Sequence, residues 1–154
     1  MTESYPGRDP NNSTEIYDLT VAHLLGPENS IVALHVKLQF NPKEPYAVTF
    51  RFLPGGDSDA VPWTFGRDLL ADGLCGQAGV GGVLVGPLDG DNRKTKITLL
   101  PTKEEDPNGT PAIVLFERSH LEGFLAETYK MVPKSQEDEV IRREIQDGLR
   151  EFFS

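Results

Sequence analysis

The sequence predicts an α+β domain in which strands and helices follow the order ββββα–βββα, with one more helix at the end of the chain. Three observations predict this fold class. Apolar and polar residues alternate along several segments, as in strands with one buried face. Short turn sequences separate these segments, and short connections favour neighbouring antiparallel strands. Apolar residues at helical spacing follow each group of strands, and the length of 154 residues fits one domain.

The first two strands are expected at residues 17–25 and 32–40. The alternating apolar positions of the first strand are Tyr17, Leu19, Val21 and Leu25. His23 shares their face, and we interpret it as a core or edge histidine, because no second metal ligand stands at a suitable spacing. The second strand carries Val32, Leu34, Val36, Leu38 and Phe40 on one face. Its other face is polar, so we expect a sheet that is covered on one side.

Residues 45–74 are expected to form a hairpin and a helix that contribute much of the core. Alternation predicts strands at 46–53 and 61–65, separated by a Gly- and Asp-rich turn at 54–59. Helical spacing then runs from Arg67 to Leu74. The residues that we expect to pack inside are Trp63, Phe65, Leu69 and Leu70. Arg67, Asp68 and Asp72 are expected on the surface of this unit.

The second half repeats the order of elements with three strands and a helix. The strands are expected at 83–85, 96–100 and 112–116, after a glycine-rich connection at 76–82. Asn108-Gly109 is a strong hairpin signal before the last of these strands. Ser119 and Glu122 have the spacing of a capping box, which predicts that a helix begins there.

The last helix is expected at 136–153, with Ser135 as its N-cap. Its apolar residues fall at spacings i, i+4, i+8 and i+11, which form a narrow seam along one side: Ile141, Ile145, Leu149 and Phe152. A helix with such a seam packs either on its own domain or on a second chain, and coiled contacts use seams of this width. We favour packing on its own domain and retain the second chain as the alternative.

The charge balance limits the possible partners. The chain has 24 acids and 15 bases, a net charge of −9, which disfavours general binding to nucleic acid or to anionic membranes. The single cysteine, Cys75, excludes an intramolecular disulfide and fits a reducing compartment. The first residues do not have the pattern of a secretory signal, and no apolar run reaches the ~20 residues of a membrane span, so we expect a cytoplasmic location.

The motifs that carry chemistry do not assemble into an active site. The glycines at 76–82 follow a helix and precede a strand, the reverse of a phosphate loop. Asp89-Gly90-Asp91-Asn92 resembles the start of a calcium loop, but Leu100 stands where the bidentate ligand is needed. The acid run Glu104-Glu105-Asp106 is expected to be solvated. The residues therefore offer no constellation for catalysis, and we predict no metal and no cofactor; an enzyme that the sequence does not reveal stays a third possibility.

Two segments resemble the signature of the SsgA-like proteins, the SsgA/SsgB family of sporulation and cell-division regulators of filamentous actinomycetes. The first is Glu44-Pro45-Tyr46-Ala47-Val48, and the second is VPWTFGRDLLADGL, from Val61 to Leu74. The family pattern there is close to DPYAV, followed by WxFARDLLxxGL. The resemblance covers roughly residues 14–132. Gly66 and Glu44 depart from it, standing where the family has Ala and Asp.

The resemblance implies a non-enzymatic protein that helps to place or assemble the division septum during sporulation. It implies FtsZ or a sister SsgA-like protein as partner, self-association as a trimer or other homo-oligomer, and a location at the septum. The implied fold is similar to that of the Whirly proteins, with two antiparallel sheets that each carry a helix. Our alternative is that the chain binds single-stranded nucleic acid, as Whirly proteins do, through Arg51, Arg93, Lys94 and Lys96. We rank it second because a shared fold does not transfer function.

These expectations divide the chain into three parts. Residues 1–13 form a disordered tail, residues 14–132 form the domain, and residues 133–154 form a helix that packs on the domain or on a neighbouring subunit. The partner-binding residues that we predict are the four seam residues Ile141, Ile145, Leu149 and Phe152, together with Arg67 and Asp68.

Overall fold

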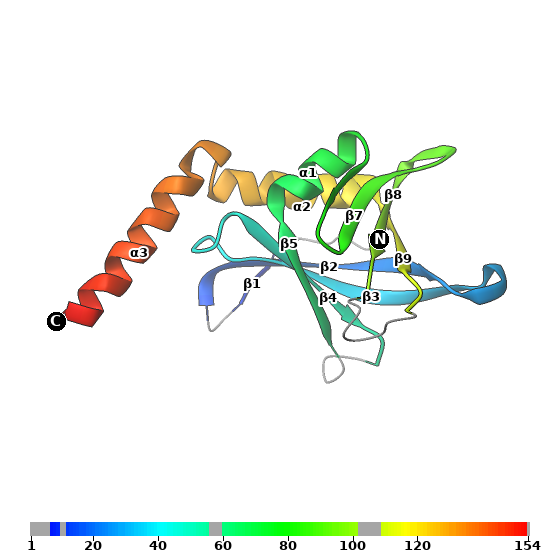
Figure 1. Ribbon diagram of the computed structural model, residues 1–154, viewed down its shortest axis with the longest axis horizontal. Coiled ribbons are helices and arrows are strands. Elements are labelled where there is room, and N and C mark those ends of the chain that lie inside the picture. The colour runs from blue at the N-terminus through cyan, green and yellow to red at the C-terminus, as the bar shows by residue number, and fades with distance from the viewer. Residues whose placement is uncertain (1–6, 10–11, 56–59, 102–108, 154) are drawn as a thin grey trace.

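The computed structural model describes residues 7–9, 12–55, 60–101 and 109–153 of the chain. These residues form a nine-stranded antiparallel sheet and three α-helices (Figure 1). Eight strands are paired in the order β5-β4-β3-β2-β9-β8-β7-β6, and β1 pairs with β2 beside this row. The predicted order ββββα–βββα is present, with β1 and β6 added to it.

The elements of the first half are β1 (Gly7–Asp9), β2 (Asn12–Leu25), β3 (Ile31–Phe40), β4 (Ala47–Leu53), β5 (Val61–Gly66) and α1 (Arg67–Cys75). Those of the second half are β6 (Ala78–Val80), β7 (Val83–Leu88), β8 (Asp91–Leu99), β9 (Ala112–Glu117), α2 (Arg118–Met131) and α3 (Glu137–Phe153). Residues 7–9 and 12–13 lie in strands, although they were expected in a disordered tail. The other predicted elements are confirmed with shifted ends.

The prediction of two separate sheets is wrong. The two halves meet where the last three residues of β2 pair with β9, at His23–Leu115, Leu24–Val114 and Leu25–Ile113. Strand β2 is 14 residues long. The same three residues at its end also pair with β3, along the other edge of the strand. Figure 1 shows β7 to β9 crossing the direction of β2 and β3 steeply, so the sheet is sharply curled at this short junction.

The core lies between the curled sheet and the helices α1 and α2, which pack on the same side of it (Figure 1). The strands contribute alternate residues, among them Val36, Leu38, Phe40, Phe50, Val85, Ile97 and Phe116. The expected core residues of the 45–74 unit are confirmed: Phe65, Leu69 and Leu70 are buried, and the half-buried Trp63 packs against them. Phe50 and Phe65 meet edge to face, with ring centroids 4.9 Å apart.

The local signals at the helix starts were misleading. Helix α2 begins at Arg118 directly after β9, and its N-cap is Glu117 without a side-chain cap bond, so the predicted capping box at Ser119 is wrong. Ser135 lies inside a 3-10 turn, Lys134–Gln136, that precedes α3. Strand β6 occupies part of the expected glycine-rich connection. Most of the turn at 54–59, the acid run 104–106 and Asn108 lie outside the described residues.

Candidate functional site

Helix α3 extends away from the sheet and from α1 and α2 (Figure 1). Three residues of its predicted seam are exposed: Ile145 by 58 %, Leu149 by 52 % and Phe152 by 82 %, and Ile141 is half-buried. We call these four residues the α3 seam. Their spacing places them on one side of the helix. The structure therefore presents an apolar stripe to solvent, where our first choice was a helix packed on its own domain.

Acidic residues border the α3 seam. Glu137, Glu144 and Glu151 lie seven residues apart and so follow one line along the helix beside the seam. Arg142 and Arg143 pair with Glu139, and Arg150 pairs with Asp147, all within α3. With six acids and three arginines, the helix carries negative charge next to its apolar stripe.

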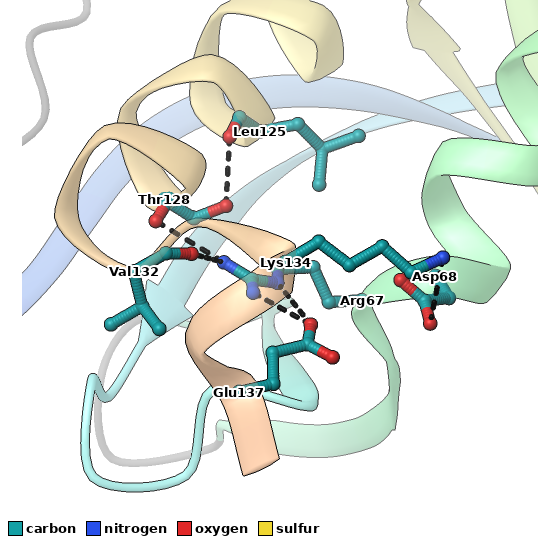
Figure 2. Close-up of polar contacts among 7 residues, drawn as sticks. All are labelled: Arg67, Asp68, Leu125, Thr128, Val132, Lys134 and Glu137. Atoms are coloured by element: carbon teal, nitrogen blue, oxygen red, sulfur yellow. Dashed lines mark hydrogen bonds and ion pairs between the residues drawn. The ribbon is translucent and has the colours of Figure 1, made fainter. Parts of the chain in front are cut away.

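Arg67, which we predicted as an exposed partner-binding residue, is completely buried, so the expected exposure is wrong. Figure 2 shows its guanidinium reaching from the start of α1 to the end of α2 and the start of α3. Nη1 donates to the carbonyl oxygens of Thr128 at 3.2 Å and Val132 at 2.8 Å, and Nη2 lies 2.6 Å from Oε1 of Glu137. Arg67 thus fixes the corner from which α3 departs.

Aromatic rings complete the enclosure of Arg67. The guanidinium carbon lies 4.2 Å from the ring centroid of Tyr129 and 5.1 Å from that of Phe40. Burial raises the pKa of the Tyr129 phenol above its usual range, and the charge of Arg67 opposes this shift. These contacts hold a charged side chain inside the protein, because the last carbonyls of α2 and the Glu137 carboxylate satisfy its donors.

Asp68, the other predicted residue of α1, is half-exposed and lies 3.4 Å from Nζ of Lys134 in the turn before α3 (Figure 2). Arg67 and Asp68 are therefore brought to the base of α3, not to its seam. They position the helix whose apolar residues face solvent.

Strand β2 faces the opposite way from its predicted orientation. Its core side carries Ile16, Asp18 and Ala22, whereas His23 and the apolar residues around it point outward. Oδ2 of the buried Asp18 carboxylate lies 3.1 Å from Nε2 of His120 on α2, whereas Oδ1 has no hydrogen-bond partner among the described residues. The two faces of β2 were assigned the wrong way round because Asp18, a charged residue, lies on the core side of the strand.

The reversed strand creates an apolar surface that the sequence did not indicate. Leu19, Val21, Leu25 and Ile31 are exposed on the side of the sheet away from α1 and α2. The register places half-buried apolar residues of neighbouring strands beside them, namely Leu53, Ile113 and Leu115. We call these seven residues the outer face. In the described part of the chain, no helix packs on this side of the sheet.

Basic side chains stand among these residues on the same side of the sheet. Lys37 lies opposite Leu19, with its Nζ 4.6 Å from the ring centroid of Tyr17. Arg51 follows on β4 and donates from Nε to the side chain of Gln39 at 2.5 Å. Lys96 lies opposite Leu115 on β8. The outer face thus has bases at its border, in a chain whose net charge is −9. It also contains two exposed histidines, because His35 lies opposite both Val21 and Leu53 and His23 lies opposite Leu115.

The basic run that we considered for nucleic acid is engaged with acids. Arg93 pairs with Asp91 at 3.1 Å, which lowers the pKa of that carboxyl, and Lys94 pairs with Glu117 of β9. Together with Arg51 and Lys96, these bases are spread over β4 and β8, which lie far apart in the strand order. They do not form a continuous basic groove of the kind that follows a nucleic-acid backbone.

Two of the cavities lined by described residues are small and polar. One of about 140 Å³ is lined by residues that include Gln77, Asp89 and Lys96, and one of about 130 Å³ by residues that include Glu15, Gln39 and Arg51. Sites for drug-sized ligands have volumes of about 300–1,000 Å³. In the described part of the chain, there is also no cluster of three or more His, Cys, Asp or Glu that could hold a metal ion. None of the helices described is long and apolar enough to cross a membrane.

The sequence matches one protein family and several named proteins. The family model described as "Streptomyces sporulation and cell division protein, SsgA" matches residues 34–137. The sporulation-specific cell division protein SsgB of Saccharopolyspora erythraea is 35 % identical over 130 residues, which cover 83 % of this chain and 86 % of that protein. SsgB of Streptomyces coelicolor is 30 % identical over 126 residues, covering 82 % of this chain and 87 % of the relative.

Solved structures show the same similarity. An SsgA-like sporulation-specific cell division protein from Thermobifida fusca superposes with a TM-score of 0.78 at 30 % identity, covering 89 % of this chain and 96 % of that one. An SsgB structure from work on longitudinal cell division during sporulation of Streptomyces coelicolor gives a TM-score of 0.71 at 29 % identity, covering 82 % and 95 % of the two chains.

Proposed function

Because this chain belongs to the SsgA family of sporulation and cell division proteins, we propose that it supports septum assembly in sporulation-specific division by binding other proteins, without catalysing a reaction. The role in sporulation cell division is that of its named relatives. The observation that carries the protein-binding mechanism is the exposed α3 seam. It extends from the body on a helix whose base is fixed by Arg67.

The α3 seam has the properties of a docking helix. Burying an exposed Leu or Ile side chain contributes about 1.5–3 kcal/mol, so Ile145 and Leu149 supply a driving force for association. Amphipathic helices commonly dock by laying such a stripe into an apolar groove or against an apolar face. Single exposed apolar residues need no explanation, but four at helical spacing form one continuous surface.

The partners that we propose follow from the family resemblance. They are FtsZ, a sister SsgA-like protein and further copies of this chain, with the protein in the cytoplasm at the division septum. A relation of the fold to the Whirly proteins belongs to the same proposal. Since the chain is strongly acidic, attraction at long range to an acidic partner is unfavourable, and docking should depend on apolar contacts.

The proposal is tested by complementation of a strain that lacks this protein. The double variant Ile145→Ser/Leu149→Ser removes the seam, and Arg143→Ser changes an exposed residue on the opposite side of α3 as the matched control. We expect the seam variant to lose most sporulation septa and the control to restore them. Normal septation by a seam variant that circular dichroism shows to be folded would contradict the proposal.

Binding is tested separately by affinity capture of purified FtsZ and of a sister SsgA-like protein across a salt series. We expect capture to persist in high salt, because apolar contacts are not screened, and to fail with Ile145→Ser/Leu149→Ser. Capture that is lost at modest salt with the wild-type chain would show that charge, not the seam, carries the contact.

A further inference from the structure

We propose that the α3 seam of one copy packs against the outer face of the sheet of a second copy. This inference rests on the proposed function, which assigns the seam to protein binding, and it names the surface that the seam meets. Each molecule carries both halves of the contact, so two copies can close as a reciprocal, isologous pair, or several copies can close as a heterologous ring.

The two surfaces match in length. The seam from Ile141 to Phe152 extends over about 16 Å, at 1.5 Å per helical residue. The outward residues of β2 from Leu19 to Leu25 extend over about 20 Å, at about 3.4 Å per strand residue. Neighbouring strands add Ile31 and Ile113 to the width of this surface. A helix laid along β2 would meet Leu19, Val21 and Leu25, with His23 between the last two.

The two surfaces also match in charge. The line of acids that borders the seam includes Glu144, while Lys37, Arg51 and Lys96 border the outer face. Docking therefore brings acids towards bases, although the whole molecules repel one another through their net charge of −9. Two seams packed antiparallel would instead bring their acidic borders together, which is unfavourable.

The seam cannot meet the outer face of its own molecule while its base is fixed as observed. The contact between Arg67 and Glu137 holds the first turn of α3 beside α1 and α2, on the opposite side of the sheet from the outer face. The rest of the helix points away from the body (Figure 1). The outer face that it covers must therefore belong to another copy.

Disulfide trapping tests the contact directly. In the Cys75→Ser background, which removes the single native cysteine, a chain with Leu149→Cys is co-expressed with a differently tagged chain that carries Val21→Cys. Both positions are exposed, so the variants should fold. Mild oxidation should produce the mixed disulfide dimer at least tenfold more efficiently than the matched pair in which Arg143→Cys, on the opposite side of α3, replaces Leu149→Cys. Equal yields from the two pairs would overturn the inference.

Two further outcomes also overturn it. If Leu149→Cys alone gives as much disulfide dimer as the mixed pair, the helices pair with one another. If light scattering gives the monomer mass of 17.0 kDa for the wild-type chain at tens of micromolar, no copy docks on another. Where copies associate as proposed, Val21→Asp and Leu149→Asp should each shift the mass to that of the monomer.

The same variants separate failure of this inference from failure of the proposed function. If the wild-type chain is a monomer but a strain that carries Ile145→Ser/Leu149→Ser still loses septation, the proposed function stands, because the seam then binds a different protein. If the disulfide-linked oligomer is trapped but a strain that carries Ile145→Ser/Leu149→Ser divides normally, the inference stands and the seam has no role in division.

Discussion

The guanidinium of Arg67 and the carboxylate of Glu137 meet at 2.6 Å, although 70 positions separate them in the sequence. This contact joins the first residue of α1 to the first residue of α3. Because Arg67 also binds the last carbonyls of α2, one side chain holds three helices at a single corner. It also determines where the α3 seam leaves the body.

We predict that Arg67→Met is strongly destabilising. Removing one member of a buried ion pair typically costs about 3–5 kcal/mol, and here the carbonyls of Thr128 and Val132 lose their donor as well. The measurement is the free energy of unfolding in urea. The matched control is Lys134→Met, which breaks an exposed ion pair with Asp68 and should cost less than about 1 kcal/mol. If the two variants lose equal amounts of unfolding free energy, the buried contact stabilises the fold no more than the exposed ion pair.

Tyr129 gives a prediction for alkaline solution. Burial raises the pKa of its phenol above the ordinary value of 10.0, so the folded state favours the neutral form. The stability that this provides is complete below about pH 10 and is lost as the pH rises through the folded-state pKa. Tyr129→Phe should reduce the fall in urea midpoint above pH 10. Parallel curves for the variant and the wild-type chain would refute this assignment.

The alternative function, binding of single-stranded nucleic acid, predicts a measurable affinity for oligonucleotides. We expect none at physiological salt, because Arg93 and Lys94 are paired with acids and the net charge is −9. Fluorescence anisotropy with labelled oligonucleotides at low and at physiological salt is the measurement. Micromolar binding that weakens with salt and is lost in a Lys94→Glu/Lys96→Glu variant would revive the alternative.

The sequence predicted those features of the fold that depend on residues close together in the chain. Turns and alternation are local, so the order of strands and helices was correct, and so was the seam of α3. The pairing of β2 with β9 was missed, because it joins segments about 90 positions apart through only three residue pairs. Without that junction, two groups of strands resemble two sheets.

The reversed orientation of β2 and the error at Arg67 have one physical cause. A charged residue was assigned to the surface, as is correct for most charged residues. Each is buried here because its partner arrives from a distant segment, His120 for Asp18 and Glu137 for Arg67. Because Asp18 is buried, the apolar side of β2 faces outward. The outer face could therefore not be predicted from the sequence of this strand alone.

The glycine of the GRDLLADGL segment, Gly73, provides the last prediction. It lies where α1 packs on β7, and a Cβ atom there would stand 2.3 Å from Cγ1 of Val85 and 3.0 Å from its carbonyl oxygen. Gly73→Ala should therefore force the helix from the strand and cost about 1–3 kcal/mol. In contrast, Gly123→Ala in α2 should stabilise the fold by about 0.5–1 kcal/mol, because apart from its chain neighbours and the backbone of its own helix nothing lies within 4 Å of the new methyl group.

The opposite signs of these two substitutions distinguish close packing from helix propensity, since both place Ala in a helix. A double-mutant cycle identifies the contact responsible. Because Val85→Gly removes the two atoms that lie nearest to the new methyl group, Cγ1 at 2.3 Å and Cβ at 2.4 Å, Gly73→Ala should cost less in that background than in the wild-type chain. An unchanged cost would mean that the carbonyl oxygen of Val85, which the substitution leaves in place, sets the limit on how closely α1 approaches β7.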